Sequence, residues 1–256
     1  AYTHIAYQTA YLKAHYLNYF MCANLTNESS KTTTDSKIVQ YISQCKKHGI
    51  RILPPSINRS YENFVPESGG TIRFGLKGLK NVGESAIRSI LSEREKNGSF
   101  KDLGDFVTRI DLCKVNKAVL ESLVKAGGLD DFGYHRSVLY SSVEDFIHQG
   151  DAIRKLRERG RQSLFGEQDF LKTITIPQDQ AGIEEWSDDQ IVQYEREISG
   201  IYLSYNPVEK FEHELKRIAN CTSARLGDFK GDSVRLGGVF TQIKELTARK
   251  NKKKYG

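Results

Sequence analysis

The residues best suited to chemistry form a short turn-like patch, Lys80-Asn81-Val82-Gly83, which interrupts an apolar helical pattern. Gly adopts positive φ freely and Asn tolerates it, so the patch predicts a tight hairpin between antiparallel helices, with Val82 tucked between them. In such a helix-hairpin-helix element, the hairpin amides and the next helix N-terminus point outward together, which suits a backbone phosphate. Lys77, Lys80 and Arg88 can add positive charge. The patch therefore predicts DNA-backbone binding, which positions a protein without reading sequence.

The same patch has a simpler interpretation as an ordinary turn between helices, with its lysines solvated. Glu84 follows Gly83 directly, and its carboxylate would compete with a phosphate for the same amides. Taken alone, the turn leaves both interpretations open.

A second candidate is an apolar pair in polar surroundings, within Gln162-Ser163-Leu164-Phe165. An exposed Leu-Phe pair is unfavourable unless a partner's pocket takes it, so the stretch is typical of a short linear binding motif. The alternative is that Leu164 and Phe165 fold back onto the helices of the chain itself.

A third candidate is the basic run from Arg249 to Lys254, which is followed by Tyr255. Basic side chains can contact phosphates and an aromatic ring can stack on a base, as in a β-hairpin that faces an oligonucleotide. A solvated tail explains this run equally well.

Enzyme chemistry has little support in the sequence. The glycine-rich nucleotide-binding, zinc-protease and serine-nucleophile motifs are absent, and the scattered cysteines lack metal-ligand spacing. The adjacent aspartates have structural explanations: Asp130-Asp131 follows a helix-ending turn, and Asp188-Asp189 lies in the first turn of a helix, where the helix dipole favours negative charge. We therefore predict no catalytic residue, no metal ligand and no cofactor in this chain. The alternative is a complete enzyme with its chemistry at Asp130 and Asp131.

Composition sets wider bounds. The chain has 256 residues, a formal charge of +6 and a pI near 9.0, which suit a polyanion partner. Its length predicts two or three modules. Met21 is the only methionine, and no apolar signal core or membrane-length apolar run is present. We expect an interior piece of a larger cytoplasmic protein without membrane partners.

The apolar periodicity predicts a mainly α chain, a bundle of short helices joined by tight turns. The expected helices cover residues 1 to about 25, 36–48, 72–82, 84 to about 96, 99–110, 117–126, 134 to about 150 and 187–199. A loop is expected from Asn24 to Ser36, a short strand over 50–53, and a further helix starting at Asn206-Pro207. From Ser233 the apolar period drops towards two, which predicts the start of a β module.

The expected helix ends rest on capping residues. The predicted N-caps are Ser99, Asn116 and Ser187, the last of these in a capping box with Gln190. The predicted terminating glycines are Gly49, Gly127 and Gly200.

Taken together and in order, several stretches resemble the alpha subunits of bacterial DNA polymerase III, the C-family replicative polymerases. AYQTAYLKAHYLNYFMCANLT resembles the end of the family's fingers region, and ILPPSINRS resembles its connector. IRFGLKGLKNVGESAIRSILSERE, SFKDLGDFVTRIDL and VNKAVLESLVKAGGLDDFG resemble its tandem helix-hairpin-helix region. GRQSLFG is similar to its internal clamp-binding motif, EREISGIYLSYNPVEKF to the next connector, and SVRLGGVFTQIKELTARKNKKKYG to the start of its OB domain. Asn81 and Arg161 depart from the family's patterns, which usually have Gly and Gln there.

The resemblance implies a C-terminal segment of a DNA-directed DNA polymerase that lacks the palm aspartates, so the fragment alone is predicted to be inactive. The parent would use Mg²⁺ bound upstream. The implied partners are duplex DNA, single-stranded DNA at the OB module, the sliding clamp and other holoenzyme subunits. The alternative is a non-catalytic helix-hairpin-helix DNA-binding or architectural protein.

The implied domains are the end of the fingers with a connector (1–70), tandem helix-hairpin-helix region (71–150), basic helix with clamp motif (151–175), connector helices (176–230) and an incomplete OB-type module (231–256). The predicted DNA-binding residues are Lys77, Lys80, Asn81, Val82, Gly83, Ser85, Arg88, Lys114, Asn116, Lys117, Arg249, Lys250 and Lys252. The predicted clamp-binding residues are Gln162, Ser163, Leu164 and Phe165.

Overall fold

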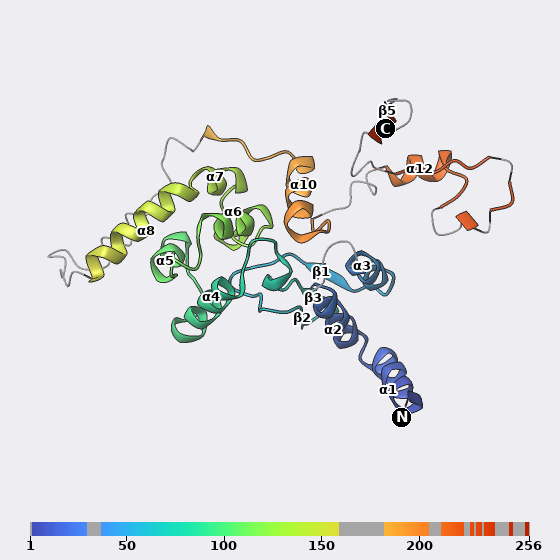
Figure 1. Ribbon diagram of the computed structural model, residues 1–256, viewed down its shortest axis with the longest axis horizontal. Helices are drawn as coiled ribbons and strands as arrows, with labels where there is room; N and C mark the ends of the chain where they lie inside the picture. The colour runs from blue at the N-terminus through green and yellow to red at the C-terminus, as the bar shows by residue number, and fades with distance from the viewer. Residues whose placement is uncertain are drawn as a thin grey trace. The chain divides into compact units, whose positions relative to one another are not determined.

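The structure is a computed structural model that describes residues 2–29, 37–158, 182–204, 211–222, 226–227, 229–231, 233–238, 246–247 and 254–255. The chain divides into two compact units, Ala1–Ser204 and Tyr205–Gly256. Most described residues are helical, as the sequence predicted (Figure 1).

The first unit begins with the helices α1 (Tyr2–His15), α2 (Leu17–Ser29) and α3 (Ile38–Lys47). The single helix predicted over residues 1 to about 25 is therefore wrong, as is the loop predicted to start at Asn24. Tyr16 separates α1 from α2, yet its amide still donates to the Leu12 carbonyl at 2.8 Å. Of these two helices, only α2 has buried residues. Because the hydrogen bonding nearly continues across Tyr16, the apolar pattern shows no break there.

A small sheet follows, built from β1 (Arg51–Leu53), β2 (Val65–Glu67) and β3 (Thr71–Arg73) in the order β1-β3-β2. β3 pairs with β1 in parallel, with Ile52 opposite Ile72, and with β2 antiparallel. Gly69 and Gly70, both at positive φ, turn the chain between β2 and β3. The predicted strand is confirmed as β1, but β2 and β3 are too short for their period to show.

Helical elements complete the first unit up to residue 158. They are the 3₁₀ turn η1 (Leu76–Gly78), α4 (Glu84–Asn97), α5 (Leu103–Arg109), α6 (Lys117–Lys125), the 3₁₀ turn η2 (Asp130–Phe132), α7 (Arg136–Ser141) and α8 (Val143–Glu158). The helix predicted over 72–82 is thus wrong. Its first residues belong to β3, and its helical part shrinks to one 3₁₀ turn.

Two other helix predictions need correction. Asp102, not Ser99, caps α5, because the Asp102 backbone is extended and its Oδ1 accepts from the Asp105 amide at 2.8 Å. The helix predicted from Tyr134 to about Gly150 is two helices that meet at Ser142, which is fully buried. The Ser142 hydroxyl and amide both donate to the Val138 carbonyl, at 2.8 and 3.1 Å, and such back-bonding bends helices.

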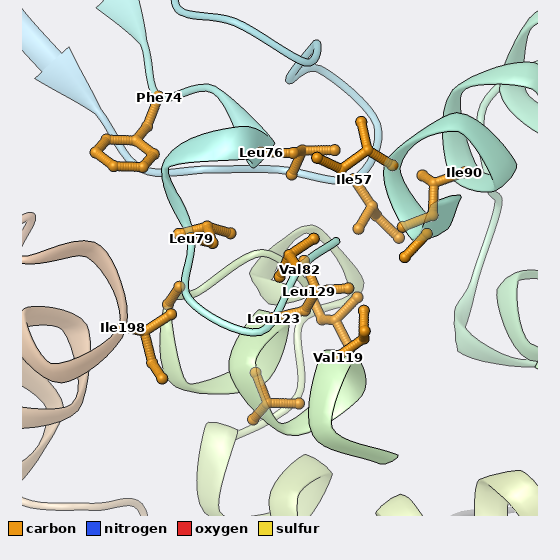
Figure 2. Packing of buried hydrophobic residues seen from close by; sticks show 14 of the residues in the cluster. Ile57, Phe74, Leu76, Leu79, Val82, Ile90, Val119, Leu123, Leu129 and Ile198 are labelled. Carbon is orange, nitrogen blue, oxygen red and sulfur yellow. The ribbon is translucent and has the colours of Figure 1, made fainter. Parts of the chain in front are cut away.

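The apolar faces of these elements form one continuous core. Figure 2 shows Val82 beside Leu123 and Leu129, and Leu79 beside Ile198. Residues from the sheet, both hairpins and a later helix therefore share one interior, which fixes the hairpins as a unit.

The later helix is α10 (Asp188–Ser199). The predicted capping box is confirmed: Ser187 accepts from the Gln190 amide, and the Gln190 side chain accepts from the Ser187 amide at 3.1 Å. Gly200 ends the helix at φ 78°.

The second unit contains α12 (Glu212–Ile218) and an antiparallel pair, β4 (Leu246–Thr247) with β5 (Lys254–Tyr255). Residues 233–238, where the sequence predicted β structure to begin, form no strand in the described part of this unit. The helix start predicted at Asn206-Pro207 lies outside the described residues. No helix among the described residues is long and apolar enough to cross a membrane.

Candidate nucleic-acid interface

The first hairpin turn, residues 79–83, connects η1 to α4. Asn81 has φ 64° and is the only residue other than glycine at positive φ in the described part of the chain. Gly83 instead has an extended backbone, with φ −73° and ψ 162°. The prediction that both residues flanking Val82 need unusual φ is therefore correct for Asn81 and wrong for Gly83.

Contacts from distant parts of the chain hold this turn in place. The Lys80 amide donates to the Ile198 carbonyl of α10 at 2.9 Å. The Asn81 carboxamide donates from Nδ2 to the Ser122 hydroxyl of α6 at 3.2 Å. Val82 is only 6% exposed and packs into the core, as predicted. The positive φ at Asn81 thus occurs where the surroundings fix the conformation.

The start of α4 has no side-chain cap. Gly83 is the N-cap, and its carbonyl accepts from the Ala86 and Ile87 amides at 3.0 and 3.1 Å. The exposed amides of Gly83, Glu84 and Ser85 find no acceptor among the described residues. An added Cβ at Gly83 would meet nothing within 4 Å of the described residues, so the space beside this residue is open. These free donors and the positive end of the helix dipole suit an anion.

The charges around the first turn are partly paired. Arg88 forms an ion pair with Glu84, and Lys77 pairs with Glu62 at 3.5 Å. The Glu84 carboxylate therefore contacts the side chain of Arg88 and does not occupy the amides at the start of its helix. Lys80 is exposed and has no acidic partner in the described part of the chain. Lys80 is the basic residue at this turn that is available to a ligand.

The second hairpin joins α5 to α6 and resembles the first at the buried valine and the N-cap, although Lys114, the counterpart of Asn81, is not at positive φ. Val115 is fully buried and precedes the N-cap Asn116, just as Val82 precedes Gly83. The Asn116 backbone is extended, with φ −76° and ψ 179°, close to that of Gly83. Asn116, however, has a side chain, and its Oδ1 accepts from the Val119 amide at 3.2 Å. This confirms Asn116 as a cap, and the cap occupies one of the donors at the start of α6.

The lysines of the second hairpin are paired with acidic side chains. Lys114 pairs with Asp111 at 3.1 Å, and Lys117 forms an ion pair with Glu144 of α8. The hydrogen bond from Lys114 lowers the pKa of Asp111. The hydrogen bond between Lys117 and Glu144 raises the pKa of Lys117 and lowers that of Glu144.

A family model described as a helix-hairpin-helix motif matches residues 49–139, a range that contains both hairpins. The alpha subunit of DNA polymerase III from Thermus aquaticus is 42% identical over 95% of this chain and 19% of its own length. The subunits from Vibrio cholerae and Campylobacter jejuni are 35% and 36% identical over 98% and 100% of the chain, and over 21% of their own lengths.

The chain is homologous to a segment of DNA polymerase III subunit alpha. It spans about a fifth of the length of these relatives, 21% of the one from Vibrio cholerae. The stretches that suggested this family in the sequence are thus part of a similarity along nearly the whole chain.

The aspartate pair Asp130-Asp131 has structural partners within the first unit. Asp130 accepts from Arg136 at 2.6 Å, and Asp131 accepts from the Ser56 hydroxyl at 2.5 Å. Burial raises the pKa of Asp130, and its hydrogen bonds with Arg136 oppose this rise. No group of three or more histidine, cysteine or carboxylate side chains with metal-site geometry occurs among the described residues.

The remaining predicted site residues are not covered by the structure. The clamp-motif residues Gln162, Ser163, Leu164 and Phe165 and the basic residues Arg249, Lys250 and Lys252 lie outside the described residues. Their roles stay predictions.

Sequence reasoning missed two residues that hold the first turn in place by hydrogen bonds, Ser122 and Ile198. Ser122 and Ile198 contact Asn81 and Lys80 across wide separations in the chain. A serine in a helix and a backbone carbonyl have no local sequence signal, so only the fold shows these contacts.

Proposed function

We propose that this chain is the part of a replicative DNA polymerase alpha subunit that holds the sugar–phosphate backbone of duplex DNA. The observation that carries the proposal is the start of α4, which has no side-chain cap and whose first amides have no acceptor among the described residues, close to the exposed Lys80. A phosphate placed there would accept from the amides and pair with the lysine. Such contacts give affinity that depends on salt and not on base sequence.

The match to a helix-hairpin-helix motif and the homology to polymerase subunits support this role. In the proposed parent protein, templated DNA synthesis with Mg²⁺ takes place in a palm site upstream of this segment. We propose that this segment positions the product duplex, with the cytoplasm as the place where it acts. The predicted domain boundaries at residues 70, 150, 175 and 230 belong to the same proposal, as does an OB-type module that meets single-stranded template.

The test is binding of the 256-residue chain to duplexes of unrelated sequence over a range of salt concentrations. We expect steep salt dependence and no sequence preference. Lys80→Ala should weaken binding by about threefold and reduce the salt slope by about one. Lys114→Ala is the matched control, because Lys114 is equally exposed but is paired with Asp111. Binding that ignores salt, or a larger loss with Lys114→Ala, would contradict the proposal.

We also propose that Gln162-Ser163-Leu164-Phe165 binds a ring-shaped sliding clamp. The alternative function, a non-catalytic architectural DNA-binding protein, requires no clamp. A pull-down with the clamp separates the two, using the double variant Leu164→Ala, Phe165→Ala as the control. Equal retention of the clamp by both proteins would remove the motif assignment. We expect no nucleotide incorporation by this chain alone.

A further inference from the structure

Residues 182–204, which contain α10 and are called the α10 segment below, pack against the hairpins although they lie beyond the helix-hairpin-helix match at 49–139. Trp186 meets Tyr140 of α7 edge-on, with ring centroids 5.5 Å apart. The Glu185 carboxylate accepts from the Arg136 and Ser137 amides at 2.7 and 3.1 Å, at the start of α7. These contacts attach the α10 segment to α7, the helix that follows the second hairpin.

The strongest attachment is a buried ion pair between Glu195 of α10 and Arg136 of α7. The Glu195 side chain is fully buried, and one oxygen accepts from Arg136 Nη1 at 2.9 Å. Arg136 also donates to Asp130, so its guanidinium connects two carboxylates. Burial alone would lower the pKa of Arg136, but its bonds with Asp130 and Glu195 raise it. A buried charge with this many partners fixes the position of the element that carries it.

Glu195 also fixes the chain that leaves α10. Its carboxylate accepts from the Leu203 and Ser204 amides at 3.2 and 2.8 Å and from the Ser204 hydroxyl at 2.5 Å. The chain after Gly200 is thus folded back onto the last turn of the helix. This arrangement sets where the final carbonyls of α10 point.

One of those carbonyls belongs to Ile198, and it accepts from the Lys80 amide of the first hairpin turn at 2.9 Å. The last four carbonyls of a helix have no partner within the helix, so this one is free to take a donor from elsewhere. Figure 2 shows the Ile198 and Leu79 side chains side by side behind the turn. The turn that presents Lys80 and the free α4 amides is thereby anchored to α10.

We propose that Glu195 is a positioning residue for DNA binding: through α10 and the Ile198 carbonyl it holds the first hairpin turn in its phosphate-binding conformation. This inference rests on the proposed function of that turn. It means that the DNA-binding element comprises the α10 segment as well as the two hairpins, and that part of its affinity is set from a residue that never touches DNA.

Glu195→Gln tests the proposal because two explanations predict opposite signs. The variant removes one negative charge, so long-range electrostatics alone would strengthen binding to DNA. Loss of positioning would weaken it, because a neutral amide can no longer pair with the Arg136 charge. We expect a several-fold fall in duplex affinity and faster hydrogen exchange at the Lys80 amide in the DNA-free protein. Amides in the middle of α4 should exchange as before.

Glu197→Gln is the matched control, since it makes the same charge change on the same helix. Glu197 is 54% exposed and pairs with Lys125 at 3.6 Å, so it takes no part in the buried ion pair of Glu195 with Arg136. The affinity of the Glu197→Gln variant for duplex DNA should stay the same or rise slightly. Ser204→Ala removes only one donor to Glu195, so it should produce the same changes as Glu195→Gln on a smaller scale. If Glu195→Gln does not fold, Ser204→Ala tests the proposal in its place.

Unchanged Lys80 exchange in a folded Glu195→Gln or Ser204→Ala protein would overturn the inference, as would equal effects of Glu195→Gln and Glu197→Gln on affinity. If the unmodified chain fails to bind duplex DNA, the proposed function falls instead. The exchange measurement needs no DNA, so it would still show whether Glu195 controls the turn.

Discussion

The two hairpin turns of this protein have similar backbones at their N-caps but differ in chemistry and in the residue before the valine, where Asn81 has positive φ and Lys114 does not. In each, a buried valine precedes an extended N-cap residue, and a helix begins at the next position. The first turn has Gly83 as the cap, and within the described part of the chain its amides have no acceptor and Lys80 has no acidic partner. The second turn has Asn116 as the cap, and its side chain accepts a hydrogen bond from the Val119 amide. The lysines of this turn are paired with acidic residues. One cap residue thus decides whether a helix N-terminus stabilises the fold or stays open to a ligand.

The largest effects are expected where the hairpins are alike. Val82→Ala and Val115→Ala should each lower the free energy of unfolding by about 2 kcal/mol, because each leaves a cavity in the shared core. Urea unfolding checks this. Under conditions where both variants are folded, only Val82→Ala should also weaken binding to duplex DNA. Equal losses of affinity would mean that the hairpins share the ligand.

A smaller effect should separate the turns by their backbones. Asn81→Ala should cost about 1 kcal/mol of unfolding free energy, because alanine is disfavoured at φ 64° and cannot bond to Ser122. Lys114→Ala, at the corresponding place in the second turn, should stay within about 0.5 kcal/mol of the unmodified protein. Asn81→Gly tests the cause, since glycine accepts this φ and should restore part of the loss. If Asn81→Ala costs nothing, the turn has relaxed and its geometry is not fixed as described.

The smallest effect concerns the occupied lysines of the second hairpin. Glu144→Gln should remove the main partner of Lys117, leave it only the longer contact with Glu121 at 3.9 Å, and strengthen duplex binding by about twofold, as measured by titration at low salt. Asp145→Asn makes the same charge change next to it but frees no lysine, so its effect should be smaller. Equal gains would show that net charge, not the release of Lys117, is responsible.

The same pair gives a pH dependence. Lys117 lowers the pKa of Glu144 in the folded state, so the pair's contribution to stability is present at neutral pH. This contribution decreases as the pH falls below the ordinary glutamate pKa, about 4.3, and is lost once the pH is below the lowered pKa of Glu144. Removing the pair by Glu144→Gln should therefore flatten this part of the acid-unfolding profile.

Features set within a few residues could be predicted from the sequence. The Asn116 cap, the Ser187–Gln190 capping box and the terminating Gly200 each depend on a side chain and a backbone group in the same helical turn. The α helices from α4 to α10 were also predicted, although the start of α5 was misplaced and the boundary at Ser142 was missed. These elements were accessible because local chemistry and apolar period agree there.

Features set by distant contacts could not be predicted. β3 was read as the start of a helix because a three-residue strand has no measurable period, and its partner β1 lies far back in the chain. Gly83 was expected at positive φ, yet its role is to be a cap without a side chain. The support of Lys80 by Ile198 depends on the fold of α10, for which the turn itself has no signal.

The central claim is that the open start of α4 is the phosphate site. Exchanging the caps tests it most directly, by measuring duplex affinity for Gly83→Asn and Asn116→Gly. Each change should alter stability by only a few tenths of a kcal/mol, because asparagine and glycine are both good N-caps. Gly83→Ala controls for bulk, since it adds a Cβ in open space and no capping oxygen.

We predict that Gly83→Asn lowers duplex affinity by about threefold or more, that Gly83→Ala lowers it less, and that Asn116→Gly leaves it unchanged or slightly higher. Unchanged affinity in a folded Gly83→Asn protein, or an equal loss with Asn116→Gly, would contradict the claim that the first hairpin holds the phosphate.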